Sequence, residues 1–126
     1  MIKALMPGAV RKYVPKSERD LPDMKQAVFM LKTLTATERA RLQDDLFTTV
    51  GVGGSRSIKM HTHSNRVETV RTGLADWRNL MHPETGQPVP YTGKPEDVDM
   101  LPDAIITELA AELTAFASLT EEQEKN

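Results

Sequence analysis

Two short segments of the chain carry residues whose types and spacing could support chemistry. The first, residues 51–57, reads Gly-Val-Gly-Gly-Ser-Arg-Ser, and glycine-rich loops can surround a phosphate with backbone amides. A P-loop also needs a Lys after its last glycine, and a dinucleotide-binding loop needs a third glycine at a fixed spacing. Since the segment provides neither, we interpret residues 48–58 as a flexible loop.

The second segment is His61-x-His63, whose spacing would place two imidazoles on one face of a strand. A zinc site needs further ligands, but the third histidine, His82, is distant in sequence and the chain has no Cys. We therefore interpret the pair as surface histidines and predict no metal site and no cofactor. A small nucleotide- or metal-binding enzyme that uses residues 51–63 stays an alternative.

The other ionisable residues form no recognisable catalytic pattern. No Ser, His and acid occur in the context of a nucleophile elbow, and the carboxylates fall mainly on expected helix faces, in turns and in the C-terminal tail. We therefore expect no enzyme and assign no catalytic residues. With 16 Lys and Arg against 18 Asp and Glu, the chain also lacks the net basic charge that nucleic-acid binding favours.

The composition of the 126 residues indicates one domain and a cytoplasmic location. No apolar run approaches the roughly 20 residues that cross a bilayer, and the absence of Cys fits a reducing compartment. The charge is unevenly spread, since residues 1–19 hold five cations and one acid, whereas residues 120–126 hold three Glu and one Lys. Such ends suit electrostatic docking to neighbours, including copies of the same chain.

The hydrophobic pattern predicts an α+β fold that is mainly α. Prolines in the first 26 residues favour extended backbone there, and Thr35-x-x-Glu38 is the capping box of a helix that follows it. The domain itself should span residues 27–119. The expected elements are an extended arm (1–26), a strand (27–34), three helices (about 36–47, 65–81 and 102–118), a short edge strand (87–91) and an acidic tail (120–126).

Several short motifs are spread over most of the chain. They include Gly-Leu-x-x-Trp-x-Asn at 73–79, Glu-Thr-Gly-Gln-Pro-Val-Pro-Tyr at 84–91, Met-Leu-Pro at 100–102 and Leu-Thr-Glu-Glu at 119–122. Together they resemble a group of small proteins encoded in the structural gene clusters of tailed bacteriophages. The resemblance implies a tail assembly chaperone that binds the tape-measure protein or tail-tube subunits, and it implies no catalytic residues. Residues 51–54 and the histidines after them do not match it.

A chaperone of this kind needs an apolar groove or helix face that covers a partner's surface. The helices expected at 65–81 and 102–118 could form such a groove, with the candidate partner-binding residues Trp77, Leu80, Phe116 and Leu119. The default role of Trp77 is nevertheless core packing, because it lies on the apolar stripe of its expected helix.

The main alternative is a component of the virion, such as a head–tail connector or a tail or capsid-associated protein, that its assembly partners order. A homo-oligomer is compatible with both readings. The chaperone would work in the cytoplasm of the infected bacterium, and the alternative places the chain in the virion.

Overall fold

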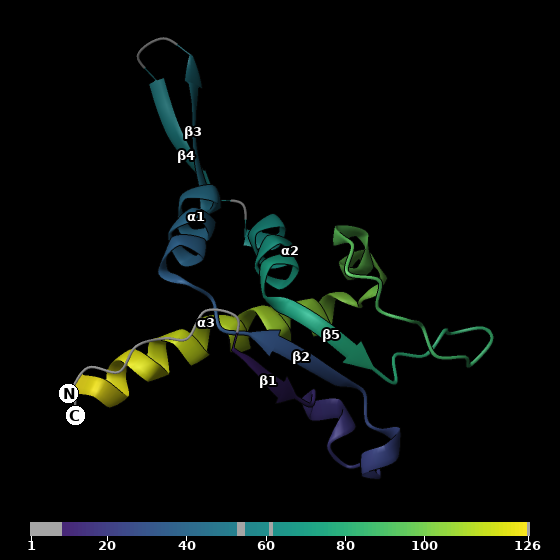
Figure 1. Cartoon of the computed structure of the whole chain (residues 1–126). Coiled ribbons are helices and arrows are strands. Elements are labelled where there is room, and N and C mark those ends of the chain that lie inside the picture. The colour runs from purple at the N-terminus through teal and green to yellow at the C-terminus, as the bar shows by residue number, and fades with distance from the viewer. Residues whose placement is uncertain (1–8, 53–54, 61, 126) are drawn as a thin grey trace.

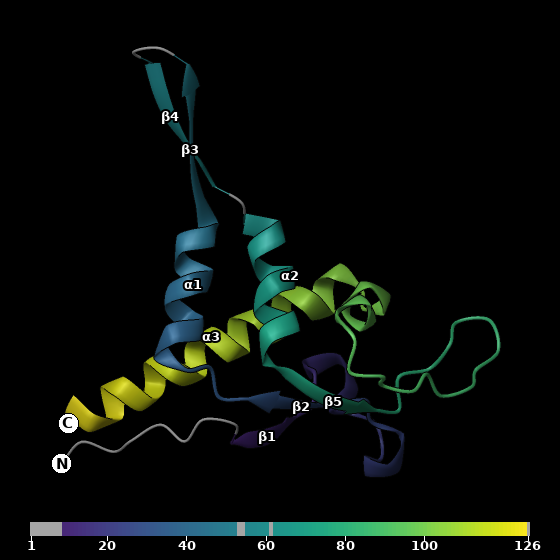
Figure 2. The same ribbon diagram turned by 45° about the horizontal axis from the view of Figure 1, so that its top comes forward.

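The computed structural model describes residues 9–52, 55–60 and 62–125, with the backbone alone for residues 45, 47–52, 55–60 and 116–125. The protein is α+β, with a three-stranded antiparallel sheet, three α-helices on one side of it and a separate two-stranded hairpin (Figures 1 and 2). In chain order the elements are β1 (Val10–Tyr13), η1 (Lys16–Glu18), η2 (Asp23–Lys25), β2 (Val28–Lys32), α1 (Ala36–Leu46), β3 (Phe47–Val52), β4 (Ser55–Met60), α2 (Thr62–Gly73), β5 (Leu74–Arg78), η3 (Pro95–Met100) and α3 (Asp103–Lys125).

The core lies between the sheet and the helices. The strand order is β1-β2-β5, so that β2 is central, and alternation of side chains along each strand gives the sheet two faces. The face that α3 covers is apolar and buried, and α2 and α3 supply the opposing side chains. The buried set includes Tyr13, Phe29, Leu31, Val70, Leu74, Trp77, Ile106, Leu109 and Leu113.

The end of α2 packs directly on α3. A Cβ placed on Gly73 would lie 2.6 Å from both methyl carbons of Leu113, which is closer than van der Waals contact permits. Leu113 is itself buried, so it has little room to move. Glycine at position 73 therefore allows the close approach of the two helices.

The local signals around β2 and α1 are confirmed. The strand expected at 27–34 is β2, and the helix expected at about 36–47 is α1. The capping box forms as predicted, because the Glu38 N–H donates to Thr35 Oγ1 at 3.1 Å and the Thr35 N–H donates to Glu38 Oε1 at 3.0 Å. The third expected helix is also present, although α3 begins after Pro102 and continues through the expected tail to Lys125.

The helix expected at 65–81 is wrong in its second half. α2 begins at Thr62 and ends at Gly73, and β5 follows at once. In β5, Asp76 pairs with Met30 and Leu74 pairs with Leu31, so Ala75 is an extra residue that forms a β-bulge. The bulge places Leu74 and Trp77 on the same buried face although they are three residues apart. That spacing imitates a helical stripe in the sequence.

The flexible loop expected at 48–58 is also wrong. β3 and β4 pair from Phe47↔Met60 to Val52↔Ser55, and the hairpin projects away from the sheet beyond the ends of α1 and α2 (Figures 1 and 2). Its sequence contains β-branched residues on both sides of a Gly-Gly pair, which is a hairpin signature. Gly53 and Gly54 themselves lie outside the described residues.

The separate N-terminal arm is wrong for residues 10–26. β1 pairs with β2 in the register Val10↔Lys32 to Tyr13↔Phe29, and Tyr13 is buried in the core. Residues 1–8 of the expected arm lie outside the described residues. The edge strand expected at 87–91 is reduced to one bridge between Met81 and Pro88, joined by a hydrogen bond from the Val89 N–H to the Leu80 carbonyl.

Candidate partner-binding groove

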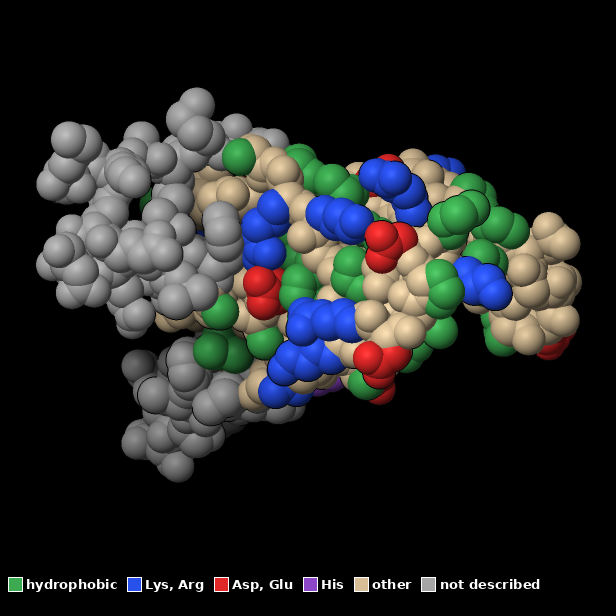
Figure 3. Space-filling view, turned by 90° about the horizontal axis from the view of Figure 1, so that it is seen from below, with side chains coloured by type: hydrophobic (Ala, Val, Ile, Leu, Met, Phe, Trp, Pro, Cys, Tyr) green, Lys and Arg blue, Asp and Glu red, His purple; other side chains and the backbone are tan. Residues whose placement is uncertain are grey.

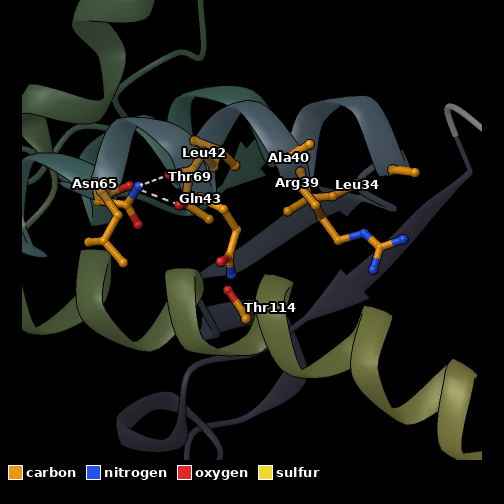
Figure 4. A pocket seen from close by; sticks show the side chains of 10 residues that line it. Leu34, Arg39, Ala40, Leu42, Gln43, Asn65, Thr69 and Thr114 are labelled. Carbon is orange, nitrogen blue, oxygen red and sulfur yellow. Dashed lines mark hydrogen bonds between the residues drawn. The ribbon is translucent and has the colours of Figure 1, made fainter. Parts of the chain in front are cut away.

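A groove of about 530 Å³ opens between α1, α2 and α3. Its floor is apolar, because Leu34 and Leu42 are 3% and 7% exposed, whereas Ala40 and Gln43 of α1 and Thr114 of α3 are exposed on its walls. Figure 4 shows Gln43 and Thr114 pointing toward one another across it. The lining residues are Leu34, Ala36, Arg39, Ala40, Leu42, Gln43, Leu46, Asn65, Thr69 and Thr114.

One amide side chain fixes the width of this groove. Asn65 Nδ2 donates to the Leu42 carbonyl at 2.6 Å and so ties α2 to α1. Thr69 Oγ1 donates to the Asn65 carbonyl at 2.8 Å within α2. The Asn65 bond therefore holds α2 against α1, and the buried leucines form the floor between them.

A second hollow, of about 360 Å³, shares Asn65, Thr69 and Thr114 with the groove. Along α3 it is lined by residues with short side chains, of which Ala111, Thr114 and Ala115 are exposed. Short side chains let another backbone approach a helix closely. The two hollows together offer a track on which a partner's helix or extended segment could lie.

Of the predicted partner-binding residues, Trp77 and Leu80 do not line this groove. Trp77 is 4% exposed, its indole Nε1–H donates to the Val89 carbonyl at 2.7 Å, and its ring meets that of Tyr91 edge to face at 5.1 Å. Its default core role is thus confirmed. Leu80 is partly buried against the same core, and the side chains of Phe116 and Leu119 lie outside those described.

The sequence does not reveal the groove, because Ala36 and Ala40 are apolar and fit the apolar side of the helix expected at about 36–47. Both are exposed in the structure and line the groove with Gln43. The spacing of residues 36, 40 and 43 marks one helix face, but the sequence gives no sign that α3 lies opposite it.

Two glutamates of α3 fasten the N-terminal segment to the body of the protein. Tyr13 Oη donates to Glu108 Oε2 at 2.6 Å, and Glu108 Oε2 also accepts the Lys16 N–H at 3.0 Å. Arg11 Nη1 lies 3.0 Å from Glu112 Oε1. Burial, and then the hydrogen bond to the Glu108 carboxylate, raise the pKa of Tyr13 to about 12.

The remaining polar clusters support turns. Burial by itself would raise the pKa of Asp97, but hydrogen bonds from Thr92, Gly93 and Lys94 outweigh it and hold that pKa below its usual value. Within residues 9–52, 55–60 and 62–125, no three His, Asp or Glu side chains are grouped as a metal site would need. His63 lies 4.0 Å from Asp103 with both side chains exposed, and His61 lies outside the described residues.

No protein-family model, no curated protein and no solved structure matches the chain significantly. In the described part of the chain, no helix has the length and hydrophobicity needed to cross a bilayer. The groove and the charged surfaces are therefore the features from which a function can be argued.

Proposed function

We propose that the chain is a non-enzymatic protein that binds structural proteins of a tailed bacteriophage during assembly, and that it acts as a tail assembly chaperone. The groove between α1, α2 and α3 is the observation that carries the proposal, and the resemblance of the motifs to phage proteins supports it. The partner would be the tape-measure protein or a tail-tube subunit, and the site of action would be the cytoplasm of the infected bacterium.

The groove suits temporary cover of a partner segment. The buried leucines Leu34 and Leu42 give a partner's apolar side chain a dry floor. The short side chains of Ala40 and Thr114 admit a helix closely, and the Gln43 amide can satisfy polar groups of the partner.

The second candidate function is a virion component, such as a head–tail connector. The β3–β4 hairpin favours it, because this hairpin projects from the body of the protein (Figure 2). Projecting two-stranded hairpins can pair with or clasp a neighbouring subunit, since their edges carry unpaired backbone groups.

Co-expression with the tape-measure and tail-tube proteins of the same gene cluster, followed by size-exclusion chromatography, tests the proposal. Ala40→Trp should fill the groove and reduce the complex about tenfold or more. Arg41→Trp is the matched control, because Arg41 is exposed on the same helix and does not line the groove. The absence of a complex with the unsubstituted chain would refute the proposal.

Mass spectrometry of purified particles separates the two candidates. The chaperone should be absent from finished particles, whereas abundant peptides from this chain would establish the virion component. Calorimetric titration with nucleotides and divalent metal ions tests the remaining alternative, and heat from saturable binding would support an enzyme or binding protein that uses residues 51–63.

A further inference from the structure

The sheet has an open face that carries cations. On the side opposite α3, the cross-strand neighbours are Val10 with Lys32, Lys12 with Met30, and Val28 with Arg78. Lys12, Lys32 and Arg78 are exposed and Val10 is 47% exposed, whereas Met30 is half-buried and Val28, at one end of this face, is buried. Figures 1 and 2 show α1, α2 and α3 on the other side, so none of the three α-helices covers this open face.

No ion pair among the described residues neutralises these cations. In the described part of the protein, Lys12, Lys32 and Arg78 have no ion-pair partner, whereas Arg71 elsewhere pairs with two carboxylates. Asp76 is the one acid in their cross-strand rows, and its Oδ1 already accepts the Trp77 N–H at 2.8 Å. Figure 3, seen from below, shows Lys and Arg side chains in this view, with hydrophobic side chains and some Asp and Glu side chains among them. Such a surface fits an acidic, partly apolar segment.

The chain itself contains a segment of that kind. Glu121, Glu122 and Glu124 fall in the last turns of α3, after the apolar residues Phe116 and Leu119. Carboxylates at this end of a helix are unfavourable, because the helix dipole makes the C-terminus negative. A cationic surface would offset that cost, so the two features are complementary in charge.

The acidic end of α3 cannot reach the open face of its own sheet. Arg11 and Tyr13 belong to the covered face, and their bonds to Glu112 and Glu108 fix α3 there. α3 continues as one helix to Lys125, and it would have to break to pass around the sheet. We infer that the open face of one copy binds the acidic C-terminal end of α3 from a second copy of this chain.

This contact joins the open face of one copy to the C-terminal end of α3 of another, so each copy carries both surfaces. Such head-to-tail contacts form rings when the rotation closes, and open filaments when it does not. Pairs of exposed charges are individually weak and are screened by salt. The association should therefore be reversible and strongest at low ionic strength. It is independent of the groove and of the proposed function.

Sedimentation velocity over a range of concentrations tests the inference. We expect association at about 0.01 M salt, where charges act over about 30 Å, and much less at about 0.15 M, where they act over about 8 Å. Lys12→Glu with Lys32→Glu should weaken association roughly tenfold or more. The matched control is Arg41→Glu with Lys94→Glu, which makes the same change in net charge at exposed positions away from the open face.

Charge reversal on both the open face and the end of α3 gives the most direct test of the inference. Glu121→Lys with Glu124→Lys should also weaken association, and a chain with all four substitutions should recover it. Circular dichroism and the recovery together exclude loss of folding as the cause. A chain that stays monomeric at low salt, association that neither reversal weakens, or a four-fold variant that does not recover would each overturn the inference.

Discussion

The two faces of the three-stranded sheet are built from the same strands and differ in charge and, over most of their area, in burial. On the covered face, Phe29 and Leu31 are 1% and 0% exposed, and Arg11 is paired with Glu112. On the open face, Lys12 and Lys32 are exposed and have no ion-pair partner in the described chain. Because successive side chains of a strand point to opposite faces, one residue packs in the core and the next lies on the other face of the sheet.

The largest expected effect is a difference in stability between alanine substitutions at two adjacent residues of β2. Phe29→Ala should lower the free energy of unfolding by about 3–5 kcal/mol, because it removes a buried ring from the core. Met30→Ala, on the open face, should cost about 1 kcal/mol or less. Urea denaturation of both variants measures the difference. Equal losses of unfolding free energy would contradict the claim that only one of the two residues is a core residue.

The next largest loss of stability is expected at the contact of α2 with α3, on the covered side of the sheet. Gly73→Ala places a methyl group against Leu113 and should cost about 1–3 kcal/mol. The double variant with Leu113→Ala should lose less than the sum of the two single changes, because the smaller side chain makes room. Strict additivity in thermal or urea unfolding would contradict this account of the helix junction.

The bond between Tyr13 and Glu108 predicts a change in stability at high pH. The folded pKa is about 12, above the usual value of 10.0, so the contribution of Tyr13 is complete below pH 10. It should be lost as the pH rises from 10 to 12, because the unfolded chain then releases the proton more readily. Tyr13→Phe should show a smaller decline over this range in urea unfolding at fixed pH.

The smallest of these effects concerns the start of α1, which forms one wall of the groove. Thr35→Ala removes the oxygen that accepts the Glu38 N–H and should cost about 1 kcal/mol. Thr35→Ser keeps that oxygen and should cost clearly less. Chemical denaturation checks both, and equal losses would show that the methyl group, rather than the cap, matters at this position.

Local signals in the sequence predict some elements and leave others undetected. The capping box at Thr35 and Glu38 identifies α1, since both of its hydrogen bonds lie within four residues. β5 was missed because the bulge at Ala75 gives Leu74 and Trp77 a helical spacing. The β3–β4 hairpin was missed because its glycines suggested a mobile loop.

The groove could not be found from periodicity, because its walls come from segments far apart in the chain. Ala40 lies on α1 and Thr114 on α3, and only tertiary packing brings them together. The open face depends likewise on the register that aligns Lys12 with Met30 and Val28 with Arg78. The resemblance to phage proteins rests mainly on motifs that build the core and its turns, such as Trp77.

Hydrogen–deuterium exchange, with and without the co-expressed tape-measure protein, tests the central claim that the groove binds another protein. We predict slower exchange in α1 and in the part of α3 around Thr114, and unchanged exchange in β2. Unchanged exchange throughout, or protection confined to the β3–β4 hairpin, would contradict it.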